Sequence, residues 1–206
     1  PNGAQAWRFA FGESAAELYI ADAKNPQFFE VLLDIERPEE SEYASVQTEA
    51  PISDLAWVSD ALSDAESILD DADTGELFTD PTVNRTYEHL FVARAGVSRV
   101  DVYDLRSDEW LDVNPLDDVI GGFDIGSPIA GLDASRERIY LPERNDLDRR
   151  VEAKVVAVST YGGSLMVLDG ATGCAATDYQ GPHVPVTQGF ESVQFTDAGR
   201  NSNPTL

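Results

Sequence analysis

Two stretches of the chain share one layout, and this internal repetition limits the fold more than any other feature of the sequence. Each stretch has a short apolar run, a glycine turn, a second apolar strand that ends in aspartate, and a further turn. The apolar runs are residues 90–93 and 155–158, and the closing aspartates, Asp104 and Asp169, stand 65 residues apart. Short apolar runs separated by glycine turns predict antiparallel β-hairpins.

The other apolar segments extend this pattern over most of the chain. Residues 17–21 and 28–35 predict two strands joined by a turn at Asp22, which makes a weaker third copy of the layout. The acidic stretch 36–49 predicts a surface loop. Apolar residues at three- and four-residue steps predict a helix over about residues 61–69. Further strands are expected at 54–58, 97–105, 109–113, 129–133 paired with 138–141, 155–159, 164–169 and 174–179.

The second strands of the repeated units carry a family resemblance. They read Val100-Asp101-Val102-Tyr103-Asp104 and Leu165-Met166-Val167-Leu168-Asp169, and the latter runs into Gly170-Ala171-Thr172-Gly173. This pattern resembles β-propeller blades of the YVTN or quinoprotein-dehydrogenase-like repeat type, over about two thirds of the chain. The resemblance implies an all-β fold of propeller-like, four-stranded antiparallel blades in one domain, residues 1–206. A β-sandwich with similar hairpins is the alternative.

The chain departs from that repeat type in two ways. Its units are more widely spaced than the usual blade of about 40–50 residues, so we expect acidic insertions at about residues 60–88 and 143–153. About three units are present, whereas a closed propeller needs about four to eight blades. We therefore expect either part of a longer propeller or an arc that partner chains complete, since an open arc leaves sheet edges and faces uncovered.

Charge excludes several classes of partner. The chain has 38 Asp and Glu against 14 Lys and Arg, of which only Lys24 and Lys154 are lysine, and its net charge is −24. Binding to nucleic-acid phosphates or to an anionic membrane needs clustered cationic residues, so neither partner is expected. No apolar stretch is long enough to span a membrane. The acidity fits either a salt-adapted organism or an acidic protein from a GC-rich genome.

The best candidate metal site is an acidic loop with the carboxylates Asp71, Asp73, Glu76 and Asp80. Ca²⁺ takes six to eight oxygen ligands, which alternating carboxylates beside a turn glycine can supply. The loop lacks the EF-hand pattern, because Ala72 and Thr74 stand where ligands belong. The alternative is a solvated acidic loop, and residues 145–148 form a weaker version of the same motif.

No catalytic motif stands out in the sequence. The two histidines, His89 and His183, have no His, Cys or carboxylate neighbour at a metal-ligand spacing, and no cofactor other than Ca²⁺ is predicted. The single cysteine, Cys174, excludes an internal disulfide. Trp57, Trp110 and Tyr161 could stack on sugar rings, with core packing as the alternative.

These features favour an extracytoplasmic β-propeller module, periplasmic, secreted or on the cell surface, that acts in binding or assembly. Its expected partners are proteins or further blades of a longer chain. The alternative is part of a propeller enzyme, either a quinoprotein-like oxidoreductase or a polysaccharide lyase or hydrolase, with its active site on the propeller axis. The sequence leaves open whether the chain is an enzyme.

Overall fold

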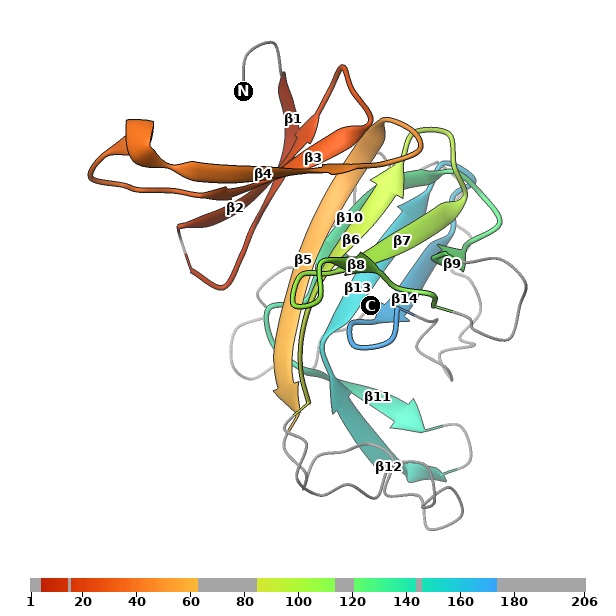
Figure 1. The fold of residues 1–206 in the computed structure, drawn as a ribbon. Helices are drawn as coiled ribbons and strands as arrows, with labels where there is room; N and C mark the ends of the chain where they lie inside the picture. Colours follow the sequence, from red (N-terminus) through yellow and green to blue (C-terminus); the bar gives the residue numbers. More distant parts are fainter. Residues whose placement is uncertain (1–4, 15, 63–84, 114–120, 144–145, 174–206) are drawn as a thin grey trace.

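The computed structural model describes residues 5–14, 16–62, 85–113, 121–143 and 146–173 (Figure 1). Within these ranges the fold is all-β, with one 3₁₀ turn, η1 (Pro38–Glu40), and no α-helix. Every strand pairing is antiparallel. The all-β class predicted from the repeated hairpins is therefore confirmed.

The strands form three main sheets and one separate hairpin. The first sheet has the order β1-β2-β3-β4, and the second has β5-β6-β7-β8, with β9 also paired to β7. The third sheet has the order β10-β13-β14, and β11 pairs with β12. The bounds are β1 Ala6–Phe11, β2 Glu17–Asp22, β3 Gln27–Leu32, β4 Glu42–Gln47, β5 Ile52–Leu62, β6 Arg85–Arg94, β7 Arg99–Asp104, β8 Glu109–Trp110, β9 Phe123–Asp124, β10 Ile129–Ala134, β11 Ile139–Glu143, β12 Asp146–Ala153, β13 Val155–Thr160 and β14 Leu165–Asp169.

The second sheet lies between the other two and buries both of its faces. One face packs on the third sheet, with Phe91, Val100 and Val102 against residues such as Val156 and Leu168. The opposite face packs on the first sheet, and the buried residues of this second cluster are Tyr19, Ala21, Phe28, Ile52, Leu55, Leu90, Val92 and Tyr103. Alternation along β7 sends Val102 to one cluster and Tyr103 to the other, as the period of a strand requires.

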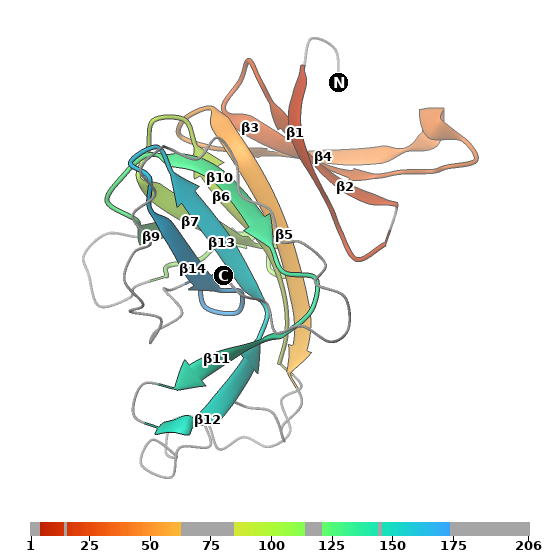
Figure 2. The same ribbon diagram turned by 180° about the vertical axis from the view of Figure 1, so that it is seen from behind.

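The first strands of the three sheets are neighbours. Both β1 and β10 contact β5, so the first strand of each sheet lies on one common side of the stack (Figures 1 and 2). Along the chain, the strands of each of the first two sheets then follow one another away from that side. This arrangement is compatible with successive propeller blades. The described sheets do not close into a ring.

The aspartate turns confirm the register of the repeat. Asp22, Asp104 and Asp169 each end a strand, β2, β7 and β14. In each case the carboxylate Oδ1 accepts a hydrogen bond of 2.9 Å from the backbone N–H two residues further on. An aspartate whose side chain accepts a hydrogen bond from the nearby backbone stabilises a turn locally. This explains why aspartate recurs at each of these positions.

Three sequence-based expectations were wrong. Residues 42–47 form strand β4 inside the stretch expected to be a loop, and β5 continues to Leu62 where a helix was expected to begin. Residues 129–133 do not pair with 138–141, because β10 pairs with β13 and β11 pairs with β12. Within the stretches expected to be insertions, β5 and β6 pair as far as Leu62 and Arg85, and β12 covers 146–153. Residues 63–69 and 174–179 lie outside the described ranges.

Candidate functional site

The proposed Ca²⁺ ligands Asp71, Asp73, Glu76 and Asp80 lie outside the described residues, as do His183 and Cys174. The weaker acidic motif falls partly on a strand, because β12 begins at Asp146. Among the described residues, no group of three or more His, Cys, Asp or Glu side chains is placed to hold a metal ion. In the same part of the chain, no helix is long and apolar enough to cross a membrane.

His89 holds the second sheet to the third. Its ring is buried, and Nδ1 lies 2.8 Å from the carbonyl oxygen of Gly170, at the end of β14. The ring of Tyr87 lies beside it, with 5.1 Å between the ring centroids. Burial lowers the pKa of His89 below its ordinary value, since a charged imidazole would lose its hydration there. The geometry gives His89 a structural role between two sheets.

The three aromatic residues proposed for sugar stacking have different surroundings. Trp57 donates its indole N–H to Glu88 Oε1 at 3.1 Å. Trp110 packs edge-on against Phe28 and Tyr103, with centroid distances of 6.3 and 5.0 Å. Tyr161 is 64% exposed. Trp57 also packs against the apolar cluster between the first two sheets, so packing accounts for Trp57, whereas Trp110 remains 36% exposed.

Carboxylates gather where the first sheet meets the second. Burial raises the pKa of Glu30, and the charges of Asp108, Glu88 and Glu17 raise it further. Burial also raises the pKa of Glu88, with added repulsion from Glu17 and Glu13. One oxygen of Glu17, Oε2, is buried without a hydrogen-bond partner. This contact between the sheets therefore holds like charges together at an electrostatic cost, which the sequence could not show because the acids come from different sheets.

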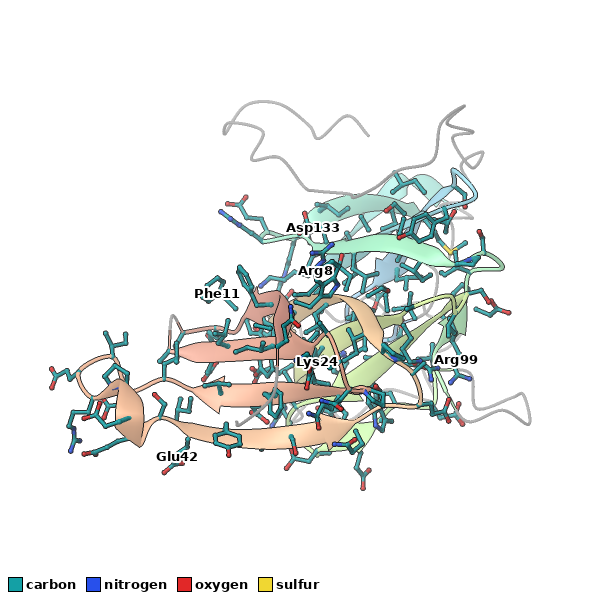
Figure 3. The ribbon with its side chains drawn as sticks, turned by 90° about the horizontal axis from the view of Figure 1, so that it is seen from above. Arg8, Phe11, Lys24, Glu42, Arg99 and Asp133 are labelled. Carbon is teal, nitrogen blue, oxygen red and sulfur yellow. The ribbon has the colours of Figure 1, made fainter. Side chains whose placement is uncertain are left out.

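A second polar group links the three first strands. Arg8 Nε of β1 lies 3.7 Å from Asp54 Oδ1 of β5, and the backbone N–H of Leu132 in β10 donates to Asp54 Oδ2 at 2.8 Å. Figure 3 shows Arg8 between the first sheet and Asp133 of β10. Burial raises the pKa of Asp54, and the charge of Asp133 adds to this rise. Asp54 thus contacts groups from all three sheets on the common side of their first strands.

The face of the first sheet that points away from the second sheet is apolar and uncovered. Ala10, Tyr19, Ala21 and Phe28 pack toward the second sheet, so the alternate residues of these strands point the other way. We call this set the outer face: Phe9, Phe11, Leu18, Ile20, Phe29, Val31, Tyr43 and Ser45, which pair across β1 to β4 in two rows. No described element lies beyond it in either view (Figures 1 and 2).

Aromatic side chains dominate the outer face. Phe9 is 63% exposed, Phe11 56% and Tyr43 58%. Phe9 and Phe11 contact each other edge-on at 5.7 Å, and Phe29 contacts Tyr43 at 6.1 Å. Exposed apolar patches that continue over several strands are typical of interaction sites. Sequence analysis missed β1 and β4, and therefore could not place these aromatics on one surface.

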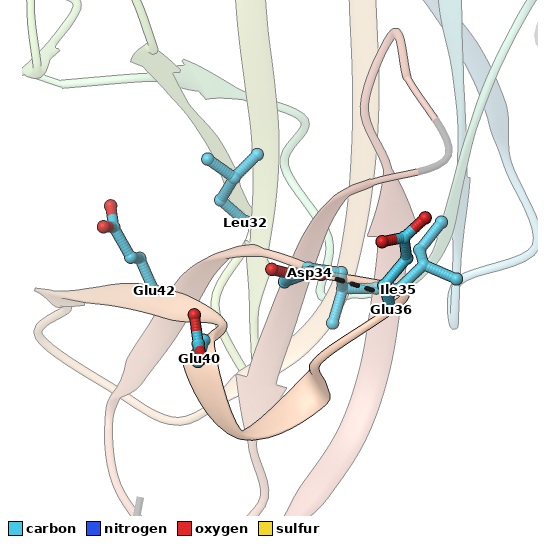
Figure 4. Close-up of a pocket in the computed structure, with 7 residues that line it drawn as sticks. Leu32, Asp34, Ile35, Glu36, Glu40 and Glu42 are labelled. Carbon is cyan, nitrogen blue, oxygen red and sulfur yellow. Dashed lines mark hydrogen bonds between the residues drawn. The ribbon is translucent and has the colours of Figure 1, made fainter.

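A shallow depression of about 470 Å³ lies at one end of the first sheet, where β3 connects to β4 (Figure 4). Its lining combines apolar Leu32 and Ile35 with the carboxylates of Asp34, Glu36, Glu40 and Glu42. Asp34 is already engaged, because its Oδ1 accepts the N–H of Glu36 at 3.0 Å. Arg37 pairs with Glu40 at 2.7 Å. Leu32 and its cross-strand pair Glu42 share the side of Phe28, so the depression lies at the end of the sheet on the side opposite the outer face.

Comparisons with known proteins add little to this description. No family model and no curated protein sequence matches the chain. Among solved structures, the chain is similar to one described as "Crystal structure of the computationally designed Ika4 protein". The two share 13% sequence identity with a TM-score of 0.49, over 96% of this chain and 83% of the other.

Proposed function

We propose that the chain is a β-propeller-type module, of the YVTN or quinoprotein-dehydrogenase-like kind, that binds protein partners through the outer face of its first sheet. The main support for this proposal is the exposure of Phe9, Phe11 and Tyr43 on one surface without charged residues. Leaving such side chains in water forgoes roughly 1.5–3 kcal/mol each of burial free energy. An extracytoplasmic location belongs to the same proposal and rests on the resemblance to that repeat type.

The test is the native mass of the assembly formed in the cells that make the protein. The wild-type chain is expected in a complex larger than one chain. Phe9→Lys is expected to release the chain from this complex, because burying an unpaired charge in the contact is costly. Tyr161→Lys is the matched control, since Tyr161 is equally exposed but lies on the third sheet's hairpin. Equal assembly masses for wild type and Phe9→Lys would exclude the proposal.

An enzyme with its site on the propeller axis is the second candidate. The observation that favours it is Asp54, a half-buried carboxylate of raised pKa on the common side of the first strands. Perturbed carboxylates are enriched at functional sites, but structural networks perturb them too. Asp54→Ala distinguishes a structural role from a functional one. A clear loss in the free energy of unfolding would indicate that the hydrogen bond from Leu132 to Asp54 is structural, whereas an unchanged or increased value would favour a functional carboxylate.

A further inference from the structure

The outer face extends over all four strands of the first sheet. Its width therefore limits which kind of protein surface can cover it. Its two rows run across all four strands, Phe9–Ile20–Phe29–Ser45 and Phe11–Leu18–Val31–Tyr43. None of these eight residues carries a charge. A single helix or extended peptide would cover one stripe of this surface. Another sheet packed at the usual distance of about 10 Å would cover both rows at once.

The size of the face argues against a freely formed pair of identical chains. An aromatic side chain buries about 150–250 Å², so Phe9, Phe11 and Tyr43, each a little over half exposed, offer roughly 300 Å² together. A stable interface buries about 800 Å² on each partner. A second copy would add the repulsion of two chains of net charge −24. The partner must therefore supply more than a matching apolar face.

The charge at one end of the outer face indicates which further contact the partner must make. The β1–β2 turn and the β3–β4 connection lie at the same end of the sheet, as the antiparallel order requires. They bring together exposed carboxylates, which are Glu13, Glu36, Glu39 and Glu40. Arg37 is the cation of this connection and is already paired with Asp34 and Glu40. A partner with cationic side chains at this end would meet complementary charge.

We infer that the outer face binds the apolar face of an antiparallel β-sheet in a partner protein, and that this partner presents Lys or Arg side chains to the β3–β4 connection. The inference rests on the proposed function and specifies its partner. The aromatic rows supply the buried centre of the contact, and the carboxylates supply its charged rim.

Photo-crosslinking in the cells that make the protein tests the partner's identity. The probe is p-benzoylphenylalanine at Phe9, with the same probe at Tyr161 as the control position. The expected result is a crosslink from position 9 alone to a peptide with alternating apolar residues and nearby Lys or Arg. A crosslink to a second copy of this chain, to lipid or to a helical segment would overturn the inference while leaving the assembly result intact. No crosslink from position 9 would also overturn it.

Salt dependence tests the charged rim independently. The isolated complex is expected to dissociate as NaCl rises from 50 to 500 mM, and Glu36→Gln with Glu39→Gln is expected to weaken it at least threefold at low salt. The control exchanges Glu109 and Glu137, which are exposed carboxylates away from the outer face. Binding that strengthens with salt, or an equal effect of the two double variants, would contradict a cationic partner.

Discussion

At the residue scale, Gly122 shows how closely the segment before β9 approaches β7. A Cβ built at Gly122 would lie 1.7 Å from the carbonyl oxygen of Val100 and 2.5 Å from the Cα of Asp101. These are backbone atoms that no side-chain rotation can move. The glycine is therefore required by close contact, at the point where the chain enters the pairing of β9 with β7.

Gly122→Ala is expected to destabilise the protein by about 3 kcal/mol or more, since overpacking a tight site costs about 1–3 kcal/mol even where side chains can adjust. Denaturant unfolding would measure the change. Gly96→Ala is the matched control, because a Cβ there meets nothing within 4 Å and only its φ of 75° is unfavourable. The control is expected to lose about 1–2 kcal/mol. Equal losses of stability in the two variants would show that the backbone at Val100 moves to accommodate the added methyl group.

The buried His89 is expected to make the stability of the protein depend on pH. Its folded pKa is lowered, so as pH falls below about 6.5 the unfolded chain takes up a proton before the folded protein does. The free energy of unfolding is therefore expected to fall over this range. His89→Asn should lack this slope, so the stability gap between wild type and variant narrows from pH 7.5 to pH 5. His183→Asn is the control, and a matching change of slope in that variant would rule out His89 as the source.

At the element scale, the contact between the first two sheets combines good packing with poor electrostatics. Phe28, Tyr103 and Trp110 interlock edge-on, with Phe28 and Tyr103 5.5 Å apart. At the same contact the pKa values of Glu30 and Glu88 are raised by burial and by neighbouring carboxylates. The apolar cluster holds the sheets together despite this repulsion.

Glu30→Gln with Glu88→Gln is expected to raise the free energy of unfolding at pH 7. The gain should be less than about 1 kcal/mol per residue, because both side chains are partly solvated. Folded pKa values above the ordinary 4.5 mean that stability falls as pH rises through the interval between the two states. The advantage of the variant should therefore shrink near pH 4.5. Thermal unfolding at both pH values measures it, with Glu109→Gln as an exposed control.

At the scale of the whole molecule, the net charge of −24 opposes compaction. Raising NaCl from 0.02 to 0.5 M shortens the screening length to below about 10 Å, so the melting temperature is expected to rise. For a chain of this size each kcal/mol corresponds to about 2–4 °C. A variant with Glu36, Glu39 and Glu42 changed to Gln should respond less. A melting temperature that stays constant over this range would mean that the acidic surface does not limit stability.

The stacking of sheets is also a property of the whole molecule. The second sheet has both faces buried, whereas the outer face of the first sheet is bare in the described part of the chain. The sequence led us to expect uncovered faces from the number of repeated units. It did not identify the face, because the alternating aromatics of β1 were not recognised as a strand and β4 lies in a stretch that was expected to be a loop.

The sequence by itself determined the local features of this protein. Apolar runs, glycine turns and the aspartates Asp22, Asp104 and Asp169 specified strands and turns, because their interactions span only a few residues. The tertiary structure alone decided that β10 pairs with β13 across the β11–β12 hairpin, and that Arg8, Asp54 and Leu132 meet. It also gathered Phe9, Phe11 and Tyr43 on one face. Such contacts depend on which sheets stack, and stacking is set by the sum of many weak apolar contacts between residues far apart in the chain.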